Sequence, residues 1–172
     1  MVLNQTTNAE TGFWDSLYAR PAARTATLRE INTVADVEET YGGRDRFKLL
    51  ELIDPQPGDT ILDCGCGTGA NLTLLQRFGN AYGFDISPLG IEIGRALGRR
   101  RLVRASVTAA PFAGEAFELV TSFDVIYALD PGEAQQALAE MFRLTRPGAH
   151  VVINVAAMDV LRGDHSVLSR ER

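Results

Sequence analysis

The chain is poor in the residues that bind metals or form disulfides: its 172 residues include two cysteines and two histidines. A tetrahedral zinc site needs four ligands. Cys64 and Cys66 have no second cysteine pair nearby, and His150 and His165 lie far along the chain. We expect the two cysteine side chains to point to opposite faces of a strand end, which disfavours a disulfide. Both are therefore predicted to be small, buried, reduced residues, with no metal site.

The sequence also lacks the segments that would carry a protein into or across a membrane. No apolar run approaches the roughly 18 residues of a membrane-spanning helix. The first residues, Met1–Thr6, have neither the basic stretch nor the apolar centre of a signal peptide. We expect a cytoplasmic protein without membrane contact.

An excess of positive charge is absent as well, since 17 Lys and Arg face 22 Asp and Glu, for a net charge of −5. Such a chain does not attract a phosphate backbone over its whole surface, and no nucleic-acid partner is expected. One basic cluster consists of Arg99, Arg100, Arg101 and Arg104. We interpret it as a solvated helix end, where cations suit the helix dipole, in preference to a nucleic-acid patch.

What the chain does contain is the composition of a globular domain, with 45% apolar and 23% charged residues. Apolar segments bounded by turn residues alternate with segments of helical spacing. The expected strands are 60–64, 81–85, 101–105, 117–123 and 149–156, and the expected helices are 69–78, 88–98 and 132–145. This alternation predicts an α/β fold with a doubly wound, mostly parallel sheet that binds ligands at the carboxyl ends of its strands.

The residues before the first strand predict two or three helices between 11 and 54. We divide the chain into an N-terminal helical segment, 1–54, and a sheet domain, 55–172. The helices have two possible roles that we weigh equally. They could cover one face of the sheet, or they could form a lid over the ligand. The lid residues would be Phe13, Trp14, Tyr18 and Arg20.

The most informative segment is the run Thr60–Asn71, in which a short apolar strand reaches Asp63 and then breaks into alternating glycines. A second strand ends at Asp85, where a carboxylate can accept both hydroxyls of a ribose. Two ligand classes share such a loop. A dinucleotide would place its pyrophosphate at the helix N-terminus, but Asp63 would repel it. The acid instead favours a nucleoside that carries an amino acid, which means S-adenosylmethionine.

The sequence here resembles the class I S-adenosylmethionine-dependent methyltransferases of the small-molecule type. Ordered blocks between about residues 45 and 165 carry the resemblance, namely 60–71, 83–87, 105–107 with 111–112, 117–125 and 146–153. It implies a Rossmann-like domain with S-adenosylmethionine as cofactor and S-adenosylhomocysteine as product.

The resemblance also implies a cofactor site. Gly65, Cys66, Gly67 and Gly69 would form the loop beneath the methionine part of the cofactor, and Asp63 would face its ammonium group. Ile86 would lie against the adenine and Phe123 near the sulfonium. Ser106 stands where many relatives carry Asp, and its hydroxyl accepts the adenine amino hydrogen more weakly than a carboxylate. The N–H of Val107 would meet a ring nitrogen.

Two residues after the fourth strand are candidates for catalysis. Asp124 would act as a general base or only cap its loop. Tyr127 stands where relatives often carry His. No base is needed if the acceptor is already nucleophilic, because positioning then suffices.

The family's sheet normally has seven strands, and this sequence stops soon after the fifth. We therefore expect a sheet truncated after that strand, whose edge Val151–Val155 would be apolar and open. A second copy in a homodimer or a missing C-terminal segment would cover it.

Two functions from different classes follow. The first is a methyltransferase acting on a small molecule. The second is a non-catalytic module that binds S-adenosylmethionine or a similar nucleoside and works by association with another chain. A nicotinamide-dependent dehydrogenase is a weaker third reading, which Asp63 argues against.

Overall fold

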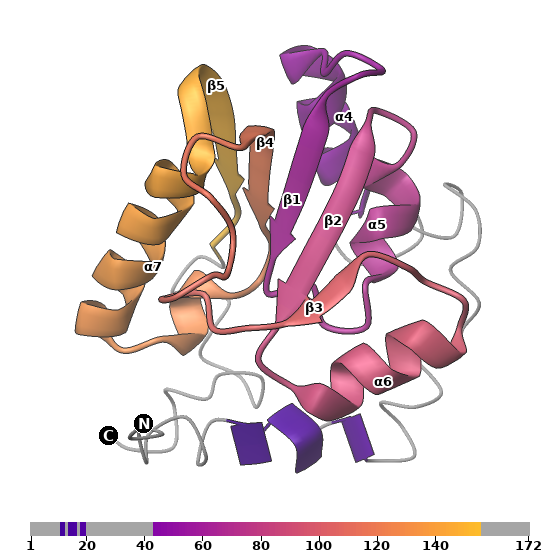
Figure 1. Cartoon of the computed structure of the whole chain (residues 1–172), viewed down its shortest axis with the longest axis vertical. Helices are drawn as coiled ribbons and strands as arrows, with labels where there is room; N and C mark the ends of the chain where they lie inside the picture. The colour runs from indigo at the N-terminus through magenta and orange to yellow at the C-terminus, as the bar shows by residue number, and fades with distance from the viewer. Residues whose placement is uncertain (1–10, 13, 17, 20–42, 156–172) are drawn as a thin grey trace.

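The fold is built on a sheet of five parallel strands in the order β3-β2-β1-β4-β5 (Figure 1). The computed structural model describes residues 11, 12, 14–16, 18, 19 and 43–155. The strands are β1 (Thr60–Cys64), β2 (Asn80–Asp85), β3 (Leu102–Arg104), β4 (Phe117–Ser122) and β5 (Thr145–Ile153). The helices are α4 (Gly43–Ile53), α5 (Ala70–Leu75), α6 (Pro88–Ala96) and α7 (Pro131–Leu144), with a 3-10 turn η1 (Ile126–Ala128). The predicted α/β class is confirmed.

Helices cover both faces of the sheet, as a doubly wound fold requires. On one face α4, α5 and α6 contribute Leu50, Leu72 and Ile91 to a buried cluster. On the other face Met141 and Leu144 of α7 pack into a second cluster. The strand residues alternate between the two clusters, which is why they read as nearly continuous apolar runs.

The topology places the ligand end of the sheet. The chain runs outward from β1 to β2 and β3, then returns to β4 on the other side of β1. The carboxyl ends of β1 and β4 therefore border a topological switch point, where open α/β sheets bind ligands. Figure 1 shows the described pieces of residues 11–19 across this same end of the sheet.

Local signals set the helix starts at this end. Ser87 caps α6 by accepting the N–H of Gly90, and Pro88 follows at the first helical position. Asp130 and Glu133 form a reciprocal capping box at the start of α7, with Pro131 at its first position.

The largest departures from the expected element boundaries concern one helix, one strand and a short turn. The predicted helix 69–78 ends at Leu75, because a hydrogen-bonded turn replaces its last residues. The predicted strand 149–156 begins at Thr145 and ends at Ile153. Its register against β4 shifts, with Thr145 opposite Phe117 and His150 opposite Leu119. The turn η1 was not predicted.

Some expectations fall on residues that the structure does not describe: Phe13, Arg20, His165 and the first helices between 20 and 42. The division of the chain at residue 54 stays a prediction. Within the described segments, no helix combines the length and hydropathy needed to cross a membrane.

Candidate functional site

A cavity of about 700 Å³ opens at the carboxyl ends of the strands. This volume suits a small-molecule site. It brings together most of the predicted site residues, namely Gly65, Cys66, Gly67, Asp85, Ile86, Ser106, Val107, Phe123, Asp124 and Tyr127. Its wall does not include Asp63 or Gly69. Unpredicted residues in the wall include Arg46, Thr68, Asn71, Leu129 and Glu133.

The glycine loop fits this cavity because of its backbone geometry. Gly65 has φ +75°, and a Cβ there would lie 2.4 Å from Val125 Cγ2. Gly67 has φ +56°, and a Cβ there would lie 2.5 Å from the Tyr18 hydroxyl oxygen. A side chain at either position would therefore be both strained and obstructed. The loop is shaped to bring bare backbone to the cavity.

Asp85 ties this loop to the start of α6. Its Oδ2 accepts the Gly67 N–H at 2.7 Å, and its Oδ1 accepts the Ser87 N–H at 2.9 Å. Burial raises the pKa of Asp85, while these backbone donors oppose the shift. Each carboxylate oxygen retains a further acceptor position, which is what two ribose hydroxyls would need.

Asp63 lies behind the loop with no exposed surface. Its Oδ1 accepts from the Thr121 hydroxyl at 2.8 Å, whereas its Oδ2 is buried without a hydrogen-bond partner in the described chain. Burial raises the pKa of Asp63 to about 7, and the nearby Thr121, Asn71 and Arg46 side chains oppose that rise. Among the described residues, this oxygen therefore lacks the hydrogen bond that a buried polar atom normally has.

Arg46 of α4 is the main site residue that the sequence reasoning missed. Its Nη1 donates to Asn71 Oδ1 at 3.2 Å, and its Nη2 forms an ion pair with Asp124 Oδ2. The guanidinium lies 4.8 Å from the centre of the Phe123 ring. Its Nε is buried without a partner among the described residues. Only the packing of α4 against the sheet brings Arg46 here.

Asp124 is held on both sides of its carboxylate. Its backbone has φ 61°, in the left-handed region. Its N–H donates to Asn154 Oδ1 at 2.5 Å, and Asn154 Nδ2 returns a bond to Asp124 Oδ1 at 2.9 Å. Arg46 occupies Oδ2. In this arrangement each carboxylate oxygen of Asp124 already has one partner.

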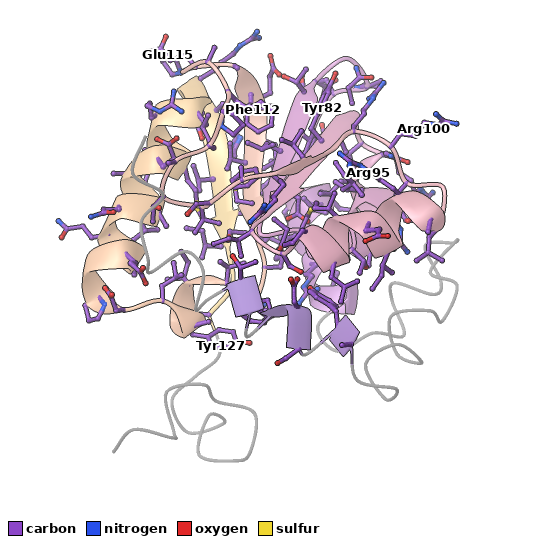
Figure 2. All side chains as sticks on the ribbon, turned by 60° about the horizontal axis from the view of Figure 1, so that its bottom comes forward. Tyr82, Arg95, Arg100, Phe112, Glu115 and Tyr127 are labelled. Carbon is purple, nitrogen blue, oxygen red and sulfur yellow. The ribbon has the colours of Figure 1, made fainter. Side chains whose placement is uncertain are left out.

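The remaining predicted residues lie around the same cavity. Ser106 forms a turn in which its hydroxyl oxygen accepts the Thr108 N–H at 3.3 Å and pairs with the Thr108 hydroxyl at 2.8 Å. Tyr127 lies in η1, and burial raises its pKa, with Asp124 adding to the shift. Figure 2 shows Tyr127 at the end of the molecule where the described N-terminal pieces lie.

The N-terminal pieces touch the site directly. Trp14 and Tyr18 line the cavity. Between them, Asp15 Oδ1 accepts from the Ser87 hydroxyl at 2.5 Å and from the Leu89 N–H at 3.3 Å, at the start of α6. Burial raises the pKa of Tyr18 far above its usual range, and the charge of Asp85 adds to this. Of the two roles considered for the N-terminal helices, α4 fills the covering role, and Trp14 and Tyr18 lie where a lid would.

The two cysteines are buried free thiols in different core clusters. Gly65, with its φ of +75°, turns the chain between them. Cys66 Sγ would lie 2.8 Å from a Cβ at Gly83, so a bare Gly83 gives this thiol its space. Cys66 therefore contributes to the floor of the cavity by packing.

Gly69 has a structural position as the N-cap of α5, with φ +80°. A Cβ there would lie 2.9 Å from Leu102 Cδ2 of β3. The helix can approach β3 because this position lacks a side chain.

The basic cluster is partly absorbed into the fold. Arg99 Nη1 donates to the Thr68 carbonyl at 3.1 Å, and Arg104 Nε donates to the Ile86 carbonyl at 3.3 Å. Arg101 lies 5.0 Å from the Tyr82 ring centre. Figure 2 shows Arg100 projecting away from the molecule. Three of its four arginines thus contact neighbouring segments. Arg100, Arg101 and Arg104 remain exposed, as expected of a solvated helix end.

Comparison with known proteins assigns the family. The profile of the family described as methyltransferase domain matches residues 62–153. The chain belongs to this family, and the resemblance to class I S-adenosylmethionine-dependent methyltransferases is confirmed. S-adenosylmethionine is the cofactor of that class.

Two curated relatives illustrate the range of the similarity. A demethylmenaquinone methyltransferase of Renibacterium salmoninarum is 33% identical over 150 residues, covering 80% of this chain and 60% of the relative. A probable tRNA methyltransferase 9B of Mus musculus is 32% identical over 109 residues, covering 63% of this chain and 24% of the relative. The chain therefore spans less than two thirds of the length of these relatives.

Solved structures confirm the Rossmann-like fold. Geranyl diphosphate C-methyltransferase from Streptomyces coelicolor has a TM-score of 0.66 at 17% identity, with 88% of this chain and 66% of that chain covered. A Haloferax volcanii putative methyltransferase, solved in complex with the Trm112 activator, has a TM-score of 0.61 at 21% identity, with 80% and 57% covered. At these identities the likeness shows the fold alone.

Proposed function

We propose that the chain binds S-adenosylmethionine and transfers its methyl group to a small-molecule acceptor. The observation that carries the proposal is a pair of buried atoms near the glycine loop that have no partner among the described residues. Asp63 Oδ2 is an acceptor and Arg46 Nε is a donor. An α-amino acid group offers the complementary pair, because its ammonium donates and its carboxylate accepts.

The nucleoside half of the cofactor has its own supports. Asp85 can accept the two ribose hydroxyls while it holds Gly67 and Ser87. Ile86 would pack against the adenine, with Ser106 and Val107 at its edge, since all three line the cavity. The bound methionine group would lie over Gly65 and Gly67.

The cofactor supplies a methyl group on a positively charged sulfur, which a nucleophile of the acceptor takes as the sulfur–carbon bond breaks. Phe123 and Tyr127 would line the point of transfer and exclude water. Asp124 is paired in the structure, so positioning is the main contribution that these side chains offer. An acceptor with an acidic proton would need Asp124 or Tyr127 to become available.

An apolar, compact acceptor suits the rest of the cavity. Trp14, Val125, Tyr127, Ala128 and Leu129 provide aromatic and aliphatic walls. The names of the demethylmenaquinone and geranyl diphosphate enzymes refer to substrates with apolar parts. The net charge of −5 supports a small molecule over a nucleic acid, despite the tRNA methyltransferases among the relatives.

Calorimetric titration with S-adenosylhomocysteine tests the binding step. Charge-assisted hydrogen bonds contribute about 1.5–3 kcal/mol each, so Asp85→Asn should weaken the affinity by about 10- to 100-fold. Glu92→Gln removes a charge from the exposed side of α6 and should leave the affinity unchanged. Unchanged affinity in Asp85→Asn, or preferential binding of a nicotinamide dinucleotide, would contradict the cofactor assignment.

Methyl transfer itself is tested with a panel of hydroxylated and aromatic acceptors and labelled cofactor. Transfer to at least one of them is expected. Cofactor binding without transfer to any acceptor would favour the non-catalytic module.

A further inference from the structure

Arg46 joins the two parts of the cavity. On the side of the glycine loop its Nη1 donates to Asn71, the second residue of α5. On the other side its Nη2 is paired with Asp124, in the segment between β4 and η1. The side chain is only 11% exposed, and its guanidinium lies over the Phe123 ring. One cation therefore contacts both the glycine-loop side and the β4 side of the cavity.

Asp124 depends on this cation. Asn154 satisfies its Oδ1 and its backbone N–H, and Arg46 satisfies its Oδ2. With Oδ2 in the ion pair, Arg46 takes one of the two positions through which this oxygen could contact an acceptor. Loss of Arg46 from Oδ2 would leave Asp124 held by Asn154 alone, with one oxygen facing the cavity that it lines.

A second carboxylate would compete for the same guanidinium. Within the described chain, the Arg46 nitrogen without a partner is Nε, and a carboxylate binds most strongly when it takes two parallel N–H groups. The two pairs of donors that can bind in this way are Nε with one Nη, or the two Nη atoms together. Asn71 and Asp124 each take one N–H of an Nη atom, and each Nη carries a second N–H. A ligand carboxylate on Nε and the adjoining Nη would add a second anion to a guanidinium that is already paired, so the two carboxylates compete for one positive charge.

We propose that Arg46 is a positioning residue shared between Asp124 and the carboxylate of the cofactor's amino acid group. Cofactor binding draws Arg46 away from Asp124 and frees Asp124 Oδ2 toward the acceptor part of the cavity. This inference rests on the proposed function. Asp124 would then face the acceptor only after the cofactor has bound. The ion pair between Arg46 and Asp124 would thus set the order in which cofactor and acceptor bind.

The test compares two ligands that share the nucleoside. S-adenosylhomocysteine carries the amino acid group, and 5′-methylthioadenosine lacks it. If Asp124 competes with the ligand carboxylate for Arg46, then Asp124→Asn should bind S-adenosylhomocysteine about three- to tenfold more tightly, in line with measured couplings between contacting groups. The affinity for 5′-methylthioadenosine should not change. Asn suits this position because it tolerates φ 61° and keeps an acceptor for Asn154.

The alternative predicts the opposite sign. If Asp124 only holds Arg46 in place, Asp124→Asn weakens S-adenosylhomocysteine binding, and that result or an unchanged affinity overturns the proposal. Glu51→Gln removes one negative charge from the exposed side of α4 and controls for general electrostatics. It should leave both affinities unchanged.

A double-mutant cycle locates the effect at Arg46. Arg46→Met should weaken S-adenosylhomocysteine by about 10- to 100-fold and leave 5′-methylthioadenosine unaffected. On that background Asp124→Asn should have no further effect, and a persisting gain would exclude Arg46 as the shared group. Asp124→Ser is the second variant if Asp124→Asn fails to fold, with the same expected sign. If the wild-type chain binds neither ligand, the proposed function itself fails.

Discussion

Asp63 offers a test of the electrostatics at the scale of one residue. Its pKa rises from 3.8 to about 7 on burial. Between these values the folded chain binds a proton that the unfolded chain has released, so stability falls as the pH rises through this window. Asp63→Asn should remove this component. The free energy of unfolding of the variant minus that of the wild type should increase from pH 5 to pH 8. Urea denaturation at each pH measures this difference.

The informative quantity is the difference between wild type and Asp63→Asn, and not the pH dependence of either protein alone. Burial also raises the pKa of Asp85, so a decline with pH persists in the variant. Curves that run parallel for wild type and variant would show that Asp63 remains ionised in the folded chain, and that its open oxygen is satisfied in another way.

The sequence predicts a site residue when a local pattern marks it. It does not predict a residue that reaches the site only through packing between distant elements. Asp85 ends a strand two residues before a helix cap, so its place follows from the segment alone. Arg46 precedes the first strand by 14 positions, and Asn154 lies 30 positions after Asp124. Nothing in their spacing marks them, because both reach the site through contacts between elements.

At the scale of elements, α6 packs against the glycine loop through a bare helix face. A Cβ at Gly94 would lie 2.3 Å from the Thr68 carbonyl oxygen. We expect Gly94→Ala to destabilise the fold by about 1–3 kcal/mol, the usual effect of overpacking. It should also weaken S-adenosylhomocysteine binding, since Thr68 lines the cavity. Chemical denaturation and calorimetry measure the two effects.

Gly58→Ala is the matched control, because a Cβ there would meet nothing within 4 Å. It should change neither stability nor affinity appreciably. If Gly94→Ala proves equally silent, α6 can move away from the loop, and the close packing seen here is not required for the site.

The elements show the same division between local and non-local information. The start of α7 follows from Asp130, Pro131 and Glu133, all of which are local signals. The start of β5 at Thr145 does not, because Pro147 and Gly148 are typical of a turn. Gly148 has φ +80°, and the strand resumes its pairing beyond it with a shifted register. The residues before and after this shift form one strand because both pair with β4.

At the scale of the whole molecule, the open side of β5 is the feature with the clearest consequence. Asn154 donates its N–H to the Ser122 carbonyl at 3.2 Å, so alternate residues of β5 face β4. Val151 and Ile153 therefore turn their backbone groups to the other side, where no strand of the described chain pairs with them. Phe142 of α7, which is 67% exposed, borders a cavity together with Val151.

An edge with unpaired backbone groups and apolar side chains tends to pair with another strand. We expect a second copy of this chain to do so, because a symmetric dimer satisfies both edges at once. Light scattering over a concentration series should show association of the wild type. Phe142→Glu should weaken it, whereas Gln136→Glu, which adds the same charge at an exposed position of α7, should not. A monomer at high concentration, with residues 151–153 protected from hydrogen exchange, would instead mean that the chain covers this edge itself.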